Sequence, residues 1–247
     1  MSDSGSQLDL LADATSIGGL SVRRSHRARR MSIRVDPLGS VEVVVPERAR
    51  SPEVRSFVEE NRDWIARTRD QLLRGRGPVS MERPSTIDLK AVREQRAVVY
   101  DGQCQGPLRL VDDGKTIVVR GALDDSMRVN RLFISWLKDE ARKVFPPQVE
   151  ELGEKYGLSH RRVQIRAQRS RWGSCSHQGT ISLNCMLLLL APELVRYLLV
   201  HELCHLRHLN HSSRFWRLVE QYEPGYRELD RQLARAWQEL PGWALVR

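Results

Sequence analysis

The sequence predicts an α+β protein with a β-rich N-terminal half and a more helical C-terminal half. Short alternations of apolar and polar residues, separated by turn residues, fill much of the first half. From Ser126 onward the apolar residues recur with the period of a helix, and 40% of the 247 residues are hydrophobic, enough for a sizeable core. We expect a disordered polar tail over residues 1–18, a β-rich region with one long helix over residues 19–122, and a second domain over residues 123–247.

Two hairpins are predicted in the first half. Residues 21–35 and 41–45 have strand patterns and are joined by Asp36-Pro37-Leu38-Gly39, in which proline and glycine occupy favoured turn positions. A second hairpin is expected over residues 108–120, closed around Asp113-Gly114.

A long helix is predicted between these hairpins. Ser51 is expected to be its N-cap and Pro52 to lie in its first turn. The helix should end before the Gly- and Pro-containing residues 74–78. Its apolar stripe consists of Val54, Phe57, Val58, Trp64, Ile65 and Leu72.

The second half should begin with a helix from Ser126 to Pro146-Pro147, followed by a shorter one that ends at Gly157. Two strands, around Val163 and over Thr180–Asn184, should flank the loop of residues 171–176.

An apolar helix and two more helices complete the predicted fold. The segment after Pro192 is almost wholly apolar and predicts a buried helix. Ser212 or Ser213 should cap the next helix, and Pro224 should separate that helix from a last amphipathic one.

The apolar helix contains His201-Glu202-Leu203-Cys204-His205, an H-E-x-x-H pattern. On a helix the two histidines lie one turn apart and only about 40° apart in azimuth, so both imidazoles can reach one ion. Glu202 could take the proton of a zinc-bound water. Buried ionisable groups are costly unless paired or bound to a metal, although core histidines bonded to backbone are an alternative. The pattern predicts a zinc hydrolase.

His211 is the predicted third zinc ligand. On a continuous helix it would be out of reach, so the chain must bend, and Asn210 tolerates the left-handed backbone that a bend needs. Metzincins have a glycine where this chain has His208. We expect His208 to be a neighbour of the metal site or a substrate contact, and not a ligand. Glu220 and Glu223 are alternative third ligands from the next helix.

Substrate contacts are predicted with less detail. Thr180–Asn184 is the candidate edge strand to which an extended peptide could add. The candidates for stabilising an oxyanion are His208, Tyr222, Tyr226 and Arg171.

Charge and composition restrict the partners and the compartment. The chain has 40 basic and 31 acidic residues, with arginine-rich runs at residues 23–30 and 161–171 that could attract a nucleic acid or a phosphorylated ligand, or could be an ordinary solvated surface. No secretion signal and no run of about 18 apolar residues is present, so we expect a cytoplasmic protein without a membrane segment. The four cysteines are expected to be free thiols.

Several motifs together are similar to those of the YgjP-like, SprT/WSS-related metallopeptidases. The N-terminal turn at Asp36 and the helix containing Asp63-Trp64-Ile65 also resemble this family, so the resemblance covers roughly residues 20–240. It implies a zincin-like catalytic domain over residues 123–247, with Zn²⁺ bound by His201, His205 and His211 and with Glu202 as the catalytic base. The motifs are Arg169-Ser170-Arg171-Trp172-Gly173-Ser174-Cys175, Gly179-Thr180-Ile181-Ser182-Leu183-Asn184, Val200-His201-Glu202-Leu203-Cys204-His205 and Asn210-His211-Ser212 with Phe215-Trp216.

The leading functional prediction is therefore a zinc-dependent metallopeptidase, most simply an endopeptidase with a polypeptide substrate. One alternative is a zinc hydrolase of a phosphorylated small molecule or nucleotide, with Arg169 and Arg171 binding the phosphate. Another is a DNA-associated protein with a structural zinc, although structural zinc sites usually have four protein ligands and only three are apparent here.

Overall fold

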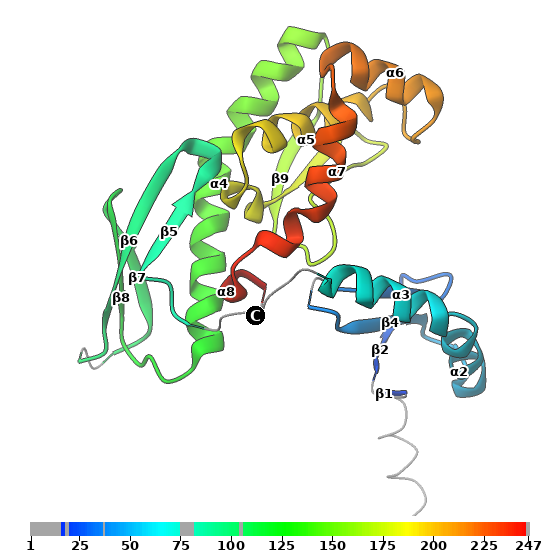
Figure 1. The fold of residues 1–247 in the computed structure, drawn as a ribbon, viewed down its shortest axis with the longest axis horizontal. Helices are drawn as coiled ribbons and strands as arrows, with labels where there is room; N and C mark the ends of the chain where they lie inside the picture. Colours follow the sequence, from blue (N-terminus) through cyan, green and yellow to red (C-terminus); the bar gives the residue numbers. More distant parts are fainter. Residues whose placement is uncertain (1–15, 18–19, 37, 75–81, 104–105, 246–247) are drawn as a thin grey trace, which may run out of the picture. The chain divides into compact units, whose positions relative to one another are not determined.

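The computed structural model describes residues 16–17, 20–36, 38–74, 82–103 and 106–245 and combines helices with β-sheets, which confirms the predicted α+β class (Figure 1). The chain divides into two compact units, residues 1–77 and 78–247. The boundary expected between residues 122 and 123 falls inside the second unit. Of the predicted tail, only Ser16–Ile17 is described, as the short strand β1, and the rest lies outside the described residues.

The first unit contains a sheet with the order β1-β2-β4-β3, where β2 is Leu20–Ser25, β3 is Ser32–Val35 and β4 is Val41–Pro46. The hairpin of β3 and β4 is confirmed, and the Asp36 carboxylate accepts hydrogen bonds from the backbone of Leu38 and Ser40, both at 2.9 Å. The single strand predicted over residues 21–35 is wrong. The valine-rich β4 is central, so β2 pairs with it in parallel on one side and β3 pairs antiparallel on the other.

The helix predicted after this sheet is two helices, α2 (Ser51–Glu60) and α3 (Arg62–Leu73). They divide at Asn61, whose side-chain amide donates to the Phe57 carbonyl at 2.7 Å and so competes with the helical pattern. Ser51 is not the N-cap. Arg50 is, and its N–H donates to the Glu53 carboxylate at 3.1 Å. Trp64, which was predicted to belong to the apolar stripe of this helix, is 44% exposed.

The second unit begins with a sheet of order β5-β6-β8-β7, whose strands are Thr86–Leu89, Glu94–Asp101, Arg109–Asp112 and Thr116–Arg120 in sequence order. The antiparallel pair β7–β8 confirms the predicted second hairpin. The sheet packs against the helix α4 (Ser126–Tyr156). Tyr100 meets Phe133 edge to face at 6.5 Å, and the Trp136 indole donates to the Asp112 carboxylate at 3.0 Å.

Helix α4 is continuous, so the break expected at Pro146-Pro147 is wrong. Phe145 and Val149, one on each side of the prolines, are both fully buried. Their packing offsets the backbone hydrogen bonds that the prolines cannot make. The predicted stop at Gly157 is confirmed, with a left-handed φ of 65°.

A small sheet lies beside the C-terminal helices and has the order β10-β11-β9. Strand β11 (Thr180–Asn184) is paired on both sides, in parallel with β9 (Arg162–Arg166) and antiparallel with β10 (Gly173–Cys175). The prediction that Thr180–Asn184 is an edge strand is therefore wrong. The short strand β10, which was expected to be loop, is one of the two outer strands of this sheet, and β9 is the other.

The remaining helices are α5 (Pro192–Cys204), α6 (Ser213–Tyr222), α7 (Tyr226–Arg235) and α8 (Gly242–Leu245). Ser212 caps α6, as predicted, by accepting a hydrogen bond from Phe215 N–H. No described helix has the length and apolar character needed to cross a membrane. Cys175, Cys185 and Cys204 are free thiols, as expected, whereas Cys104 lies outside the described residues.

Candidate metal centre

The H-E-x-x-H helix ends sooner than the sequence suggested. Helix α5 ends at Cys204 and His205 is its C-cap. The Cys204 carbonyl accepts from the N–H groups of Arg207 and His208, both at 3.1 Å, so the chain turns immediately after the second histidine. The left-handed bend predicted at Asn210 is wrong, since Arg93 is the only described non-glycine residue with a positive φ. The earlier turn is what brings His211 back toward the helix.

Three histidines converge at this turn. One nitrogen of each of His201, His205 and His211 lies within 4.8 Å of the others. The Nε2 atoms of His201 and His211 are 3.1 Å apart. His205 is buried, His201 is half-buried and His211 is exposed, so the cluster opens to solvent on the His211 side. The structure thus places together the three residues that the sequence suggested as ligands.

Neighbouring groups fix the orientation of each imidazole. His205 Nδ1 lies 3.0 Å from the His208 carbonyl, which can only accept, so Nδ1 carries the hydrogen and Nε2 keeps its lone pair. His201 Nδ1 lies 3.4 Å from the Tyr197 hydroxyl. The His211 ring stacks on Trp216, with centroids 5.5 Å apart.

Burial favours the neutral form of two of the three imidazoles, those of His201 and His205. Burial lowers the pKa of His201 to about 3, with a further contribution from its proximity to His205 and His211. Burial also lowers the pKa of His205. Neutral imidazoles offer lone pairs, which is the form that binds a metal.

Glu202 lies beside the histidines and is 4% exposed. Its Oε2 atom has no hydrogen-bond partner among the described residues. Burial raises the pKa of Glu202 to about 8, while the positive charge of Arg171 acts in the opposite direction. A buried carboxyl without a hydrogen-bond partner for Oε2, next to three converging imidazoles, is a costly arrangement that a bound cation would stabilise, so the residues present fit a divalent metal.

The backbone of β10 lies directly against Glu202. A Cβ atom on Gly173 would be 2.6 Å from Glu202 Oε1, which is closer than any real contact. The preceding segment is held firmly, because the buried Asn184 side chain donates to the carbonyls of Gln168 and Arg171, both at 2.8 Å. Trp172 stacks on Trp237 at 4.0 Å. Gly173 is therefore required at this position by the space that the carboxylate occupies.

Replacing Gly173 with alanine is expected to push the Glu202 carboxylate aside and to lower kcat of the hydrolysis that the H-E-x-x-H pattern predicts by about 10- to 100-fold, since small misplacements of reacting groups are costly. Steady-state kinetics with metal content measured in parallel would test this. Ser174→Ala, one residue along the same strand and on its opposite face, is the matched control. A folded Gly173→Ala protein with full activity would contradict this role for the glycine.

Other residues suggested by the sequence are used elsewhere. Glu223 forms an ion pair with Arg196 at 3.0 Å, and neither it nor Glu220 belongs to the histidine cluster. Tyr222 stacks on Tyr156 at 4.1 Å. Tyr226 is buried and stacks on Trp216 at 5.1 Å.

Two residues near the histidines were missed by sequence reasoning. The Tyr197 hydroxyl lies between His201 and Asp230, and it donates to the Asp230 carboxylate at 2.7 Å. Burial is the larger cause that raises the pKa of Tyr197 above its usual range, and the hydrogen bond to Asp230 raises it further. The one available signal was the position of Tyr197, one turn before His201 on the same helix face. Nothing in the sequence indicated Asp230.

Comparison with known proteins gives one extensive match. A family model described as "YgjP-like, metallopeptidase domain" matches residues 29–236 and so begins well before residue 123. No curated protein matches the chain significantly. Two solved metallopeptidase zymogens are similar to part of it. Abylysin from Pyrococcus abyssi is 33% identical, with 36% of this chain and 91% of abylysin covered and a TM-score of 0.34. Jannalysin from Methanocaldococcus jannaschii is 21% identical with the same coverages and a TM-score of 0.32.

Proposed function

Because the chain belongs to the YgjP-like metallopeptidase family, we propose that it is a zinc-dependent endopeptidase with Glu202 as the general base. The proposed ligands are His201, His205 and His211. The observation that carries this proposal is the convergence of three imidazoles beside a buried carboxyl whose Oε2 atom has no hydrogen-bond partner in the described part of the chain. A zinc ion held by three protein ligands supplies Lewis acidity, which polarises a carbonyl and lowers the pKa of water.

Glu202 would carry the proton transfers of the reaction. Its carboxylate would accept the proton of the attacking water and return it to the leaving amine. A cation held by the neighbouring histidines would lower the pKa of this carboxyl from its raised value and so favour the ionised form that a base needs. The Gly173 backbone would keep the carboxylate in place during both transfers.

We place the substrate backbone along β10. This strand is one of the two outer strands of its sheet, and it is the one whose Gly173 lies against Glu202. An extended peptide that adds to β10 by main-chain hydrogen bonds would therefore pass close to the catalytic carboxylate. This proposal replaces Thr180–Asn184, which is paired on both sides, as the docking strand.

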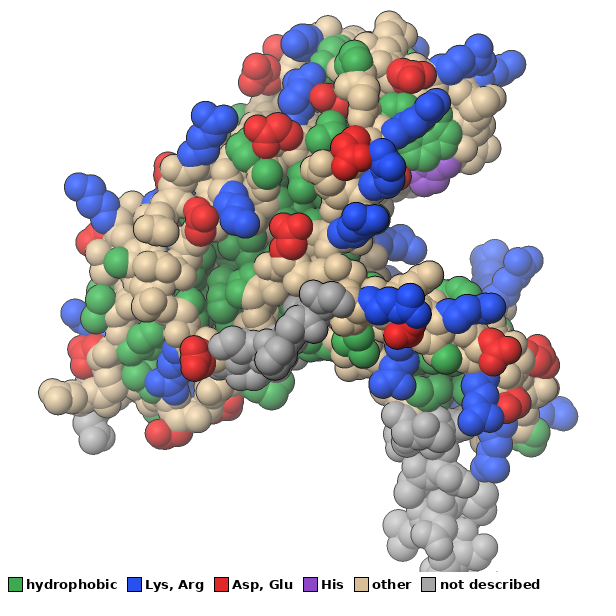
Figure 2. Space-filling view, in the orientation of Figure 1, with side chains coloured by type: hydrophobic (Ala, Val, Ile, Leu, Met, Phe, Trp, Pro, Cys, Tyr) green, Lys and Arg blue, Asp and Glu red, His purple; other side chains and the backbone are tan. Residues whose placement is uncertain are grey.

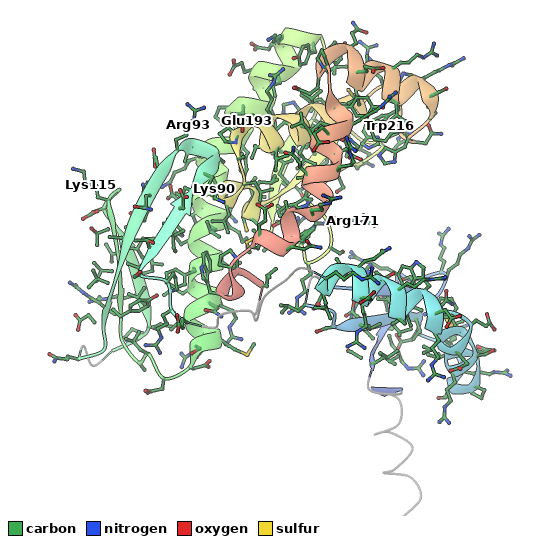
Figure 3. All side chains as sticks on the ribbon, in the orientation of Figure 1. Lys90, Arg93, Lys115, Arg171, Glu193 and Trp216 are labelled. Carbon is green, nitrogen blue, oxygen red and sulfur yellow. The ribbon has the colours of Figure 1, made fainter. Side chains whose placement is uncertain are left out.

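The surface around the histidines favours acidic polypeptides as substrates. Residues 158–192 contain five arginines and residues 203–219 contain three, and neither segment has an Asp or Glu. These segments include β9, β10, β11 and the start of α6. In the described part of the chain, no carboxylate forms an ion pair with Arg171, Arg214 or Arg217. Figure 2 shows Lys and Arg side chains near the place where histidine reaches the surface of this unit, and Figure 3 shows Arg171 and Trp216 on the side away from Lys115.

A peptide with glutamates flanking its scissile bond is expected to be cleaved with about tenfold higher kcat/KM than the same peptide with glutamines, because opposite charges accelerate association. The preference should fall as salt is raised and shrink in an Arg171→Gln, Arg214→Gln, Arg217→Gln triple variant. Arg131→Gln is the control, because Arg131 is exposed on the part of α4 that packs against the β5-β6-β8-β7 sheet. Equal cleavage of both peptides would contradict the preference.

The same assay separates the alternative functions. Competition by single- or double-stranded DNA, without any effect of peptide charge, would instead favour nucleic acid as the partner of this surface. Hydrolysis of nucleoside triphosphates that depends on Glu202, with no peptide cleavage, would favour the phosphorylated substrate.

A further inference from the structure

Tyr197 is a fully buried side chain with one polar atom, its hydroxyl oxygen. The residue has no exposed surface and lies on α5, one turn before His201. Its hydroxyl contacts two groups, the Asp230 carboxylate at 2.7 Å and His201 Nδ1 at 3.4 Å. Asp230 belongs to α7, so the hydroxyl joins a residue of the last long helix to the H-E-x-x-H helix.

The chemistry of these groups fixes the direction of both hydrogen bonds. A carboxylate only accepts, so the tyrosine hydroxyl donates its hydrogen to Asp230. The hydroxyl oxygen is then left as an acceptor, and His201 Nδ1 must carry a hydrogen to satisfy it. In a neutral imidazole this leaves the lone pair on Nε2, the atom that lies 3.1 Å from His211 Nε2.

We propose that Tyr197 and Asp230 are positioning residues that hold His201 in the tautomer and orientation required for metal binding. This inference rests on the proposed zinc site. Outer residues that orient a metal-binding histidine typically affect metal affinity by about 10- to 100-fold when they are changed. The effect of Asp230 passes through Tyr197, because Asp230 orients the hydroxyl and the hydroxyl orients the ring.

A purely structural tie between α5 and α7 is the competing explanation, and it predicts a different result. Loss of a tie would lower the stability of the metal-free protein and leave the metal affinity of the folded protein unchanged. Loss of positioning would lower the metal affinity and would also change the proton distribution of the His201 ring. The decisive measurements are therefore made on folded, metal-free protein.

The test uses Tyr197→Phe, which removes only the hydroxyl, and Asp230→Asn, whose amide can turn a donor toward the tyrosine. Tyr156→Phe is the matched control, since Tyr156 also joins two helices through its hydroxyl, with Arg196 at 2.9 Å and the Tyr222 carbonyl at 3.4 Å. Zinc affinity is measured by competition with a chromogenic chelator, thermal stability by the Tm of the metal-free protein, and the His201 tautomer by ¹⁵N NMR of the imidazole.

We expect Tyr197→Phe to lower zinc affinity by about 10- to 100-fold, Asp230→Asn to lower it in the same direction, and Tyr156→Phe to leave it unchanged. The wild-type His201 ring should carry its hydrogen on Nδ1, and Tyr197→Phe should populate both tautomers. Zinc affinity within about twofold of wild type in Tyr197→Phe, with a lowered Tm, would overturn the inference. If the wild-type protein binds no zinc, the proposed function fails, while the NMR signature still decides whether Tyr197 sets the tautomer.

Discussion

Glu202→Gln is expected to lower kcat for peptide hydrolysis by about 10²- to 10⁴-fold, the usual contribution of a general base, while about one zinc ion per chain remains bound. The amide has the shape of the carboxylate, but it cannot accept a proton from water. The side chain is 4% exposed, and among the residues that the structure describes none forms a hydrogen bond with Oε2. Steady-state kinetics and elemental analysis of the purified variant are the measurements.

Glu193→Gln is the matched control for this variant. Glu193 lies in the first turn of the same helix α5 and is exposed, so its replacement should leave both activity and zinc content unchanged. Undiminished activity of Glu202→Gln with full zinc content would show that another group takes the proton. Loss of zinc from Glu202→Gln would show instead that this residue belongs to the metal-binding shell.

His211→Ala is expected to reduce zinc affinity more than about 100-fold, beyond the range of outer residues that only orient a ligand. His211 is exposed and lies after the end of α5, so the metal-free variant should keep a nearly unchanged Tm. Chelator competition gives the affinity, and peptide hydrolysis at saturating zinc shows whether the remaining site still functions.

His177→Ala controls for the loss of any surface histidine, since His177 is exposed in the turn before β11 and lies outside the cluster. Full zinc affinity of His211→Ala would rule out His211 as a ligand. In that case Glu220→Gln and Glu223→Gln would be measured next, with the Arg196–Glu223 ion pair expected to break as Glu223 moves.

The sequence predicted those elements that are determined by residues close to one another along the chain. The glycine stop after α4, the Ser212 cap and the β7–β8 hairpin each depend on a few neighbouring residues, and each is found in the structure. The helix that carries the H-E-x-x-H motif was equally predictable, because an apolar run after a proline specifies a buried helix.

Features set by tertiary contacts could not be predicted in this way. Pro146-Pro147 predicts a break in the helix, yet buried side chains before and after the two prolines keep α4 continuous. Strand β10 is too short to show a pattern, and only its pairing with β11 and its contact with Glu202 define it. Asp230 is far from His201 in sequence. It contacts Tyr197, the neighbour of His201, because α7 packs on α5.

The continuity of α4 also affects how the catalytic half can be produced as a recombinant fragment. A fragment starting at residue 123, where the sequence suggests a domain boundary, would lack the sheet that covers the first turns of this helix. Val129, Phe133 and Leu137, all at most 1% exposed in the full chain, would then lose part of their cover and favour aggregation. A fragment intended for crystallisation or assay is better started at about residue 78, where the second unit begins, so that it includes β5 and the rest of this sheet.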